Sequence, residues 1–376
     1  MTYSRKLHVT LLLAGLLVSP ALAQTAPRPQ TQTEKQAVAY LLTQQDKNGA
    51  WIPQVGPAIT AMVLKSLVQS GMPADAPAVK SALALIESSR QKDGGYYKDS
   101  NPNYNSAIVL STFSLLQQKS PSPIFAPQIA GLQSFLKSLQ LDDTKKDAAN
   151  TAITKKSSWY GGSGYGEGRP DLSNTAYFIE ALHDSGLKGD DPAIQKALLF
   201  VTRSQMNGET NDQAFAKAAT DGGFIYTPAE GGESKFGDID SLDGSSQLRS
   251  YGTMTYSGFK SLLYAGLTED DPRVKAALKW ISTNWTLDYN PGTGGSFDGQ
   301  FYYLHAFSKA LQAYNNDKIT DAKGVKHDWR SELNDYLKSA QKPDGSFINV
   351  KSERWLEGNP VLATAYAALA LQEARK

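Results

Sequence analysis

The chain has 376 residues, of which 40% are hydrophobic and 20% charged, and it contains no cysteine. This composition excludes disorder and collagen-like repetition, and the missing thiols exclude disulfides, zinc–thiolate sites and cysteine nucleophiles. Lys and Arg number 38 against 37 for Asp and Glu, so no net charge attracts the protein to nucleic acid or anionic lipid. Length alone suggests two or three domains.

The first residues have the features of a secretory signal peptide. Arg5 and Lys6 precede an apolar run at 11–18, and an Ala-Leu-Ala sequence ends the segment. We therefore expect residues 1–23 to be removed on export to the periplasm or to the outside of the cell, with residues 24–33 as a flexible leader. No later stretch is apolar for long enough to span a membrane.

A repeated unit organises the rest of the chain. An aromatic residue or Leu is followed by an aliphatic residue, then by Gln, and then by a Gly-x-aromatic turn. The first copy begins at Tyr40 and contains Gln45, and the last begins at Tyr336 and contains Gln341. Four further copies, two of them imperfect, begin at Leu85, Phe135, Phe200 and Trp280. The pattern predicts six similar structural units.

Each unit predicts a helical hairpin. Proline marks the start of four first helices, at Pro77, Pro127, Pro192 and Pro272. The second helices have apolar residues at helical spacing within 59–68, 107–116, 175–182, 254–263, 304–311 and 361–371. Because these second helices are apolar nearly all round, they should be enclosed by the first helices. We therefore expect an all-α (α/α)6 toroid as a single domain over 34–376, with a long inserted loop at about 206–251.

The repeat resembles the QW repeat of squalene and oxidosqualene cyclases. The whole array over 34–376 is similar to the terpenoid cyclase and protein prenyltransferase toroid superfamily. In that superfamily a fold does not fix the reaction, because the chemistry lies in individual residues. The repeat residues themselves favour a bracing role, in which Gln ties helix ends together.

One segment matches the register of the cyclase acid motif. The resemblance implies an Asp-x-Asp-Asp-Thr-Ala sequence at the start of an inner helix, and here the matching residues run from Asp171 to Ala176. Ser173 stands where the proton donor should be, and Asn174 replaces the last Asp. Neither side chain can protonate an alkene, whereas both are favoured helix caps. Asp171 therefore remains as a candidate acid or as an ordinary capping residue.

Other titratable residues offer further candidates. The transferases of this fold hold zinc with Asp, Cys and His, and a chain without cysteine cannot assemble that site, so we expect no metal and no cofactor. His305 is the best single general acid or base, although a lone histidine on an inner helix is also typical of a core residue. In the inserted loop, Asp238 and Asp240 are candidates for an acid and base pair or for a cation site, or are solvated turn carboxylates.

Aromatic residues gather in and beside the turns expected at one end of the ring. The candidate ligand-binding residues are Trp159, Tyr165, Glu167, Arg169, Ser173, Asn174, Tyr251, Tyr256, Tyr302, Tyr303 and Trp355. An aromatic cavity suits an isoprenoid chain and stabilises a carbocation, but the same rings stack on sugar faces.

Three functions remain as alternatives. The first, favoured by the repeat, is an exported member of the cyclase superfamily that binds or converts an isoprenoid or other apolar ligand. The second is a secreted carbohydrate-active enzyme, either a glycosidase or a lyase, that acts on a saccharide. The third is a toroid that binds a partner without catalysis. The expected partner is thus a small apolar molecule or a saccharide, and not nucleic acid.

Overall fold

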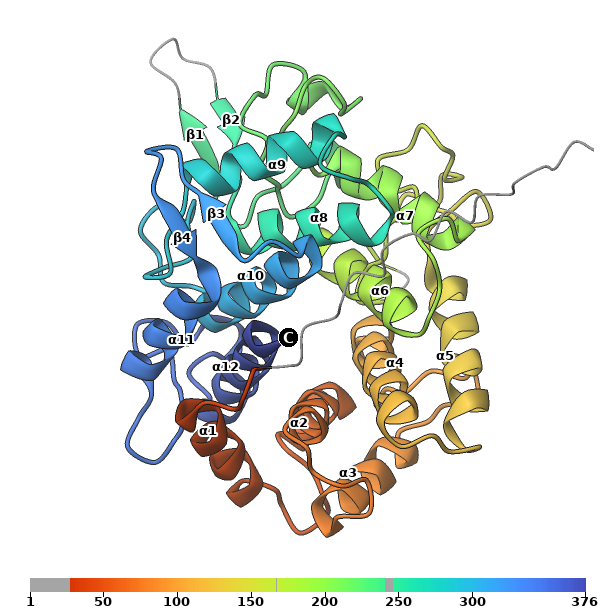
Figure 1. Cartoon of the computed structure of the whole chain (residues 1–376). Helices are drawn as coiled ribbons and strands as arrows, with labels where there is room; N and C mark the ends of the chain where they lie inside the picture. Colours follow the sequence, from red (N-terminus) through yellow and green to blue (C-terminus); the bar gives the residue numbers. More distant parts are fainter. Residues whose placement is uncertain (1–27, 167, 241–245) are drawn as a thin grey trace, which may run out of the picture.

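The computed structural model describes residues 28–376 except Glu167 and residues 241–245. The predicted signal peptide therefore lies outside the described residues. Within the described part of the chain, six inner helices surround a central axis and six outer helices surround them (Figure 1). This arrangement confirms the predicted (α/α)6 toroid.

The inner helices form a closed ring. They are α2 (Pro57–Gln69), α4 (Pro102–Lys119), α6 (Leu172–Asp184), α8 (Gly252–Tyr264), α10 (Gln300–Tyr314) and α12 (Pro360–Arg375). Each packs against the next, and α12 packs against α2. The outer helices are α1 (Gln32–Thr43), α3 (Pro77–Ser88), α5 (Phe125–Leu139), α7 (Pro192–Arg203), α9 (Pro272–Thr283) and α11 (Trp329–Ala340). None of the described helices has the length and apolar character needed to cross a bilayer.

Short elements decorate the ring. Two antiparallel hairpins pair β1 (Asp238–Asp240) with β2 (Ser246–Leu248) and β3 (Lys318–Thr320) with β4 (Lys326–Asp328). In their registers Ile239 faces Gln247 and Ile319 faces His327. The 3-10 helices are η1 (Pro53–Val55), η2 (Ala214–Ala216), η3 (Ala229–Gly231) and η4 (Arg354–Leu356).

Helix starts follow the local chemistry that the sequence indicates. Asp191 accepts a hydrogen bond from the backbone N–H of Ala193 and thereby caps α7, and Asp271 caps α9 in the same way. Helix α5 begins two residues before Pro127. Proline is tolerated there because the N–H groups of a first turn have no partner within the helix.

The repeat glutamine joins neighbouring units. Gln45 donates from Nε2 to the carbonyl of Gly49 in its own turn and to that of Ala78 in the next outer helix, at 3.1 and 2.9 Å. Gln140 and Gln205 make the equivalent pairs of bonds. Gln341 bonds Gly345 and then Thr33 of α1, so the last unit is tied to the first. The repeated glutamine thus braces the ring, as its bracing interpretation predicts.

The inserted loop lies against the N-terminal end of the inner ring. It carries a small apolar cluster of its own that includes Met206 and Ile225. The carbonyl of Tyr226 accepts the N–H of Leu172 at 2.7 Å, and that of Phe224 accepts the N–H of Tyr251. The insertion is therefore attached to the starts of α6 and α8.

The described residues before α1 are attached to the opposite end of the ring. The N–H of Arg28 donates to the carbonyl of Arg375 at 2.8 Å, and Gln30 donates to the carbonyl of Ser70 at 2.7 Å. These bonds hold residues 28–30 against the C-terminal ends of α12 and α2.

Candidate ligand pocket

A pocket of about 260 Å³ lies at the N-terminal end of the inner ring, and we call it the mouth pocket. Aromatic side chains dominate its wall: Tyr104, Tyr165, Tyr177, Tyr226, Tyr251, Tyr302, Tyr366 and Trp355. The aliphatic lining is Val55, Ile59, Met254, Leu356 and Leu362, and the polar lining is Asn101, Ser173, Lys235 and Thr253. The sequence-predicted residues that the structure brings together here are Tyr165, Ser173, Tyr251, Tyr302 and Trp355.

Four tyrosines on four inner helices form the deep part of the wall, and we call Tyr104, Tyr177, Tyr302 and Tyr366 the tyrosine layer. Tyr177 stacks parallel to Tyr302 with 6.1 Å between ring centroids, and Tyr104 meets Tyr177 edge-on at 5.3 Å. Tyr366 lies 5.5 Å from Tyr302. Burial raises the pKa of each phenol above its ordinary value. The four hydroxyls therefore stay protonated and can donate hydrogen bonds.

The acid-motif register lies at the edge of this pocket, but its carboxylate points into helix α6. Asp171 accepts hydrogen bonds at 2.8 Å from the backbone N–H of Asn174 and, on its other oxygen, from the Asn174 side chain. Burial raises the pKa of Asp171 to about 6, although these hydrogen bonds act in the opposite direction. Neither Asp171 nor Asn174 lines the mouth pocket. Ser173 does, and its Oγ lies 2.8 Å from the Tyr302 hydroxyl.

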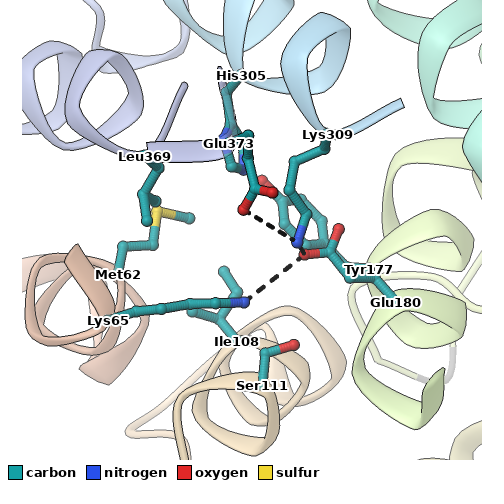
Figure 2. A pocket seen from close by; sticks show the side chains of 10 residues that line it. All are labelled: Met62, Lys65, Ile108, Ser111, Tyr177, Glu180, His305, Lys309, Leu369 and Glu373. Carbon is teal, nitrogen blue, oxygen red and sulfur yellow. Dashed lines mark ion pairs between the residues drawn. The ribbon is translucent and has the colours of Figure 1, made fainter. Parts of the chain in front are cut away.

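His305 lies deeper on α10, away from Asp171. It lines a separate cavity of about 20 Å³, the inner cavity, together with Lys65, Glu180 and Lys309 (Figure 2). Burial lowers the pKa of His305 to about 3, so the imidazole is neutral near neutral pH. Its Nδ1 is buried without a hydrogen-bond partner among the described residues. The structure therefore gives His305 a place in the core and does not join it to the acid register.

Asp238 and Asp240 lie on β1, where all three residues are exposed. Asp238 accepts a hydrogen bond from the Ser246 hydroxyl at 3.3 Å, and its carbonyl accepts one from Arg249. Neither carboxylate lines the mouth pocket. Among the residues that the structure describes, no group of His, Asp and Glu side chains is arranged to hold a metal ion.

The remaining predicted residues that the structure describes lie outside the mouth pocket. Trp159 is buried in a small cluster with Leu141, and Tyr256 and Tyr303 pack in the main core. The hydroxyl of Tyr303 donates to the carbonyl of Thr286 at 2.7 Å. Arg169 pairs with Glu233 and lies 3.4 Å from Glu230. Glu167 lies outside the described residues.

Several functional candidates were missed by sequence reasoning. Tyr104, Tyr177 and Tyr366 sit at helical spacing among apolar residues, a pattern that also predicts plain core packing. Lys235 comes from the insertion, and its Nζ lies 2.5 Å from Glu233 and 4.1 Å from the centre of the Tyr226 ring.

A buried glutamate, Glu357, caps the start of the helix that carries Tyr302. Glu357 accepts a hydrogen bond from the backbone N–H of Tyr302 at 2.8 Å and another from the Asn349 side chain. Burial raises the pKa of Glu357 to about 7. Its carboxyl group thus replaces the cap that Gly299, the residue before α10, cannot provide.

Comparisons with known proteins agree with this fold. A family model of the squalene-hopene cyclase C-terminal domain matches residues 13–120. No curated protein matches the sequence at a significant level.

Solved structures match over nearly the whole chain. An α-amylase from Clostridium perfringens has a TM-score of 0.55 at 12% identity, covering 93% of this chain and 99% of that one. The type II terpene cyclase MstE from Scytonema has a TM-score of 0.52 at 14% identity, with coverages of 91% and 97%. The GH76A α-1,6-mannanase from Salegentibacter sp. HEL1_6 has a TM-score of 0.54 at 10% identity, with coverages of 91% and 98%.

At these identities the structural matches concern the fold alone, and the matched proteins differ in activity. The family-model match shows in addition that the N-terminal part of the chain, which contains the first repeat units, is similar in sequence to a cyclase domain. Over residues 13–120 the sequence is therefore similar to the squalene-hopene cyclase C-terminal domain, and the whole fold is similar to that of terpenoid cyclase-like toroids.

Proposed function

We propose that the mouth pocket binds an isoprenoid-type ligand that carries an oxygen-containing group at one end. The observation that supports this is the wall of seven tyrosines and one tryptophan, interleaved with aliphatic side chains. Ring faces and aliphatic groups suit a hydrocarbon chain, while protonated phenols and Ser173 can hydrogen-bond an alcohol or carboxyl oxygen. A variant of MstE was solved with geranylgeranyl dihydroxybenzoate, a prenylated molecule with such a polar end.

Binding is favoured over alkene protonation at this register. Ser173 occupies the position of the proton donor and is paired with Tyr302. Asp171 uses both oxygens to hold Asn174. The described residues that line the pocket include no carboxylate. A strong acid at the reacting carbon is what cyclisation requires, and the chain places a hydroxyl there instead.

A saccharide is the second candidate. Trp355 and Tyr165 stand at the rim of the pocket and are 42% and 48% exposed. Exposed ring faces of this kind stack on sugar rings as readily as on a prenyl chain. The ligand itself must therefore be tested.

Calorimetric titration of the purified chain with farnesol and with maltotriose separates the two candidates. We expect saturable binding of farnesol and none of maltotriose, and the reverse result would overturn the proposal. Trp355→Ala should weaken farnesol binding several-fold, because a ring at the rim is lost. Tyr289→Ala is the matched control, since Tyr289 is also 42% exposed but does not line the pocket.

We also propose that the chain is exported. The supporting observation is the basic, apolar and small-residue order of residues 1–23. Fusion of residues 1–30 to alkaline phosphatase, which is active only after export, should give activity, and Leu13→Arg in the apolar run should abolish it. An inactive wild-type fusion that is nevertheless well expressed would contradict export.

A further inference from the structure

The mouth pocket and the inner cavity lie one beneath the other and share a single lining residue, Tyr177. The other members of the tyrosine layer line the mouth pocket only, and His305 lines the inner cavity only. The rings of Tyr366 and His305 are stacked with 5.5 Å between their centroids. Because Tyr366 lines the mouth pocket and His305 lines the inner cavity, this pair also lies at the boundary between the two spaces. Tyr177 is thus the residue that borders both spaces, and we call its ring the partition.

The partition is held in place from the mouth side. Tyr177 is stacked on Tyr302 and met edge-on by Tyr104, so three inner helices fix the ring. Its hydroxyl is buried and has no hydrogen-bond partner among the described residues. The ring is therefore positioned by packing, and the hydroxyl is not needed for that position.

Beneath the partition lies a set of buried charges, which we call the ion cluster: Lys65, Glu180, Asp184, Lys260, Lys309 and Glu373. Glu180 pairs with Lys260 and, at 2.7 Å, with Lys309. Lys65 pairs with Asp184 at 3.0 Å (Figure 2 shows Lys65, Glu180, Lys309 and Glu373). The cluster draws on α2, α6, α8, α10 and α12. Buried ion pairs must keep their partners, so a hydrocarbon end cannot displace them.

The inner cavity above these charges has room for about one water molecule. Apolar ligand atoms that passed Tyr177 would meet Lys65, Lys309 and Glu373 directly. The transfer of a hydrocarbon end into that environment gains little, because the wall is polar and already paired.

We infer that Tyr177 sets the depth of the mouth pocket and thereby the greatest length of ligand that the protein accepts. This inference rests on the proposed function. Replacing Tyr177 with a small residue adds the space of its ring to the mouth pocket, and the inner cavity with the ion cluster then becomes the new end of that space. The variant accepts a longer chain than the wild type, and Tyr177→Phe, which keeps the ring, does not.

The test titrates geraniol, farnesol and geranylgeraniol into the wild-type protein, Tyr177→Phe and Tyr177→Ala. We expect wild type and Tyr177→Phe to share one optimum length, beyond which affinity falls about tenfold, and Tyr177→Ala to shift that optimum to a longer alcohol. Met254→Ala is the matched control, because Met254 lines the mouth pocket but not the inner cavity. An unshifted optimum in Tyr177→Ala overturns the inference.

A second measurement separates this inference from the proposed function. Crystals of wild type and Tyr177→Ala under xenon pressure report apolar space without any prenyl ligand. Xenon in the region of the removed ring, continuous with the mouth pocket, supports the partition even if no alcohol binds, whereas a collapsed wall overturns it. Absence of alcohol binding to wild type contradicts only the proposed function. Should Tyr177→Ala fail to fold, Tyr177→Leu keeps a buried apolar side chain and serves both measurements.

Discussion

At the scale of single residues, the protonation of Asp171 makes the stability of the folded chain depend on pH. Burial raises its pKa from 3.8 to about 6, so the folded chain binds a proton more readily than the unfolded chain. That stabilisation is complete below about pH 3.8 and is lost as the pH rises through about 6. We expect Asp171→Asn to remove this dependence, of the order of 3 kcal/mol at most, in urea unfolding measured from about pH 4 to about pH 8.

Asp271→Asn is the control of opposite sign. Asp271 also caps a helix, but its hydrogen bonds with Arg273 lower its pKa, so its contribution is lost as the pH falls. Glu357 titrates in the same direction as Asp171, with a pKa near 7, but it is present in every variant and cancels in the difference. If Asp171→Asn retained the wild-type pH slope around pH 6, burial of this carboxyl would not be its source.

Single residues also show where sequence reasoning stopped. The register from Asp171 to Ala176 led to Ser173, which does line the pocket. Tyr256 and Tyr303 were indistinguishable from Tyr302 because all three lie on inner helices, and only the rotation of each helix decides which side chain faces the axis. That rotation depends on packing around the whole ring, which a linear pattern does not contain.

At the scale of elements, the repeat glutamines give a graded prediction. Gln140 and Gln205 are buried, whereas Gln45 and Gln341 are partly exposed, although each donates to two backbone carbonyls. Substitution by Ala removes the side-chain donor from both carbonyls, and water can replace that donor only at the exposed sites. We therefore expect losses of about 2–3 kcal/mol for Gln140→Ala and Gln205→Ala and about 1 kcal/mol for the other two, measured by urea unfolding.

A substitution by Glu separates the contribution of hydrogen bonding to stability from the contribution of packing. Gln205→Glu keeps the shape of the side chain but removes the donor, so it should destabilise at least as much as Gln205→Ala. Equal, small losses at all four positions would mean that the glutamine bonds contribute little and that packing alone holds the hairpins in register.

The hairpins themselves were predictable because local signals and pattern agree. Proline at the first helical position and apolar residues at helical spacing place α3, α7 and α9 correctly. The hairpin of β1 and β2 was not foreseen, since its strands are three residues long and exposed or partly exposed, and so lack any alternating apolar pattern.

At the scale of the whole molecule, the ion cluster was missed although the sequence carries a signal for it. Five inner helices that are mainly buried each have a Lys or Glu in their C-terminal half: Lys65, Glu180, Lys260, Lys309 and Glu373. One charge on an enclosed helix must be paired, so five such helices predict a shared cluster at the same end of the ring. Which charge meets which partner depends on ring closure and could not be read from the chain alone.

Because the ion cluster joins five of the six inner helices of the ring, its ion pairs affect the stability of the entire toroid. Burial raises the pKa of Glu180, but Lys260, Lys309 and Lys65 outweigh that effect and hold it well below the ordinary value. Glu180→Gln leaves three buried ammonium groups against the two remaining carboxylates of the cluster. We expect a loss of about 3–5 kcal/mol in urea unfolding at neutral pH, because the remaining charges are no longer balanced.

The matched substitution Glu87→Gln changes a pair on the outer surface. Glu87 lies 3.5 Å from Arg90, with both side chains about half exposed. The amide oxygen of Gln can still accept the hydrogen bonds that Tyr96 and Gln128 donate to Glu87, so the loss of the charge alone should cost less than about 1 kcal/mol. Adding Lys309→Met to Glu180→Gln should recover part of the lost stability, because the second substitution removes one unbalanced charge from between α6 and α12. A Glu180→Gln protein as stable as Glu87→Gln would mean that water reaches the cluster, and the inner end of the barrel would then be open rather than sealed by paired charges.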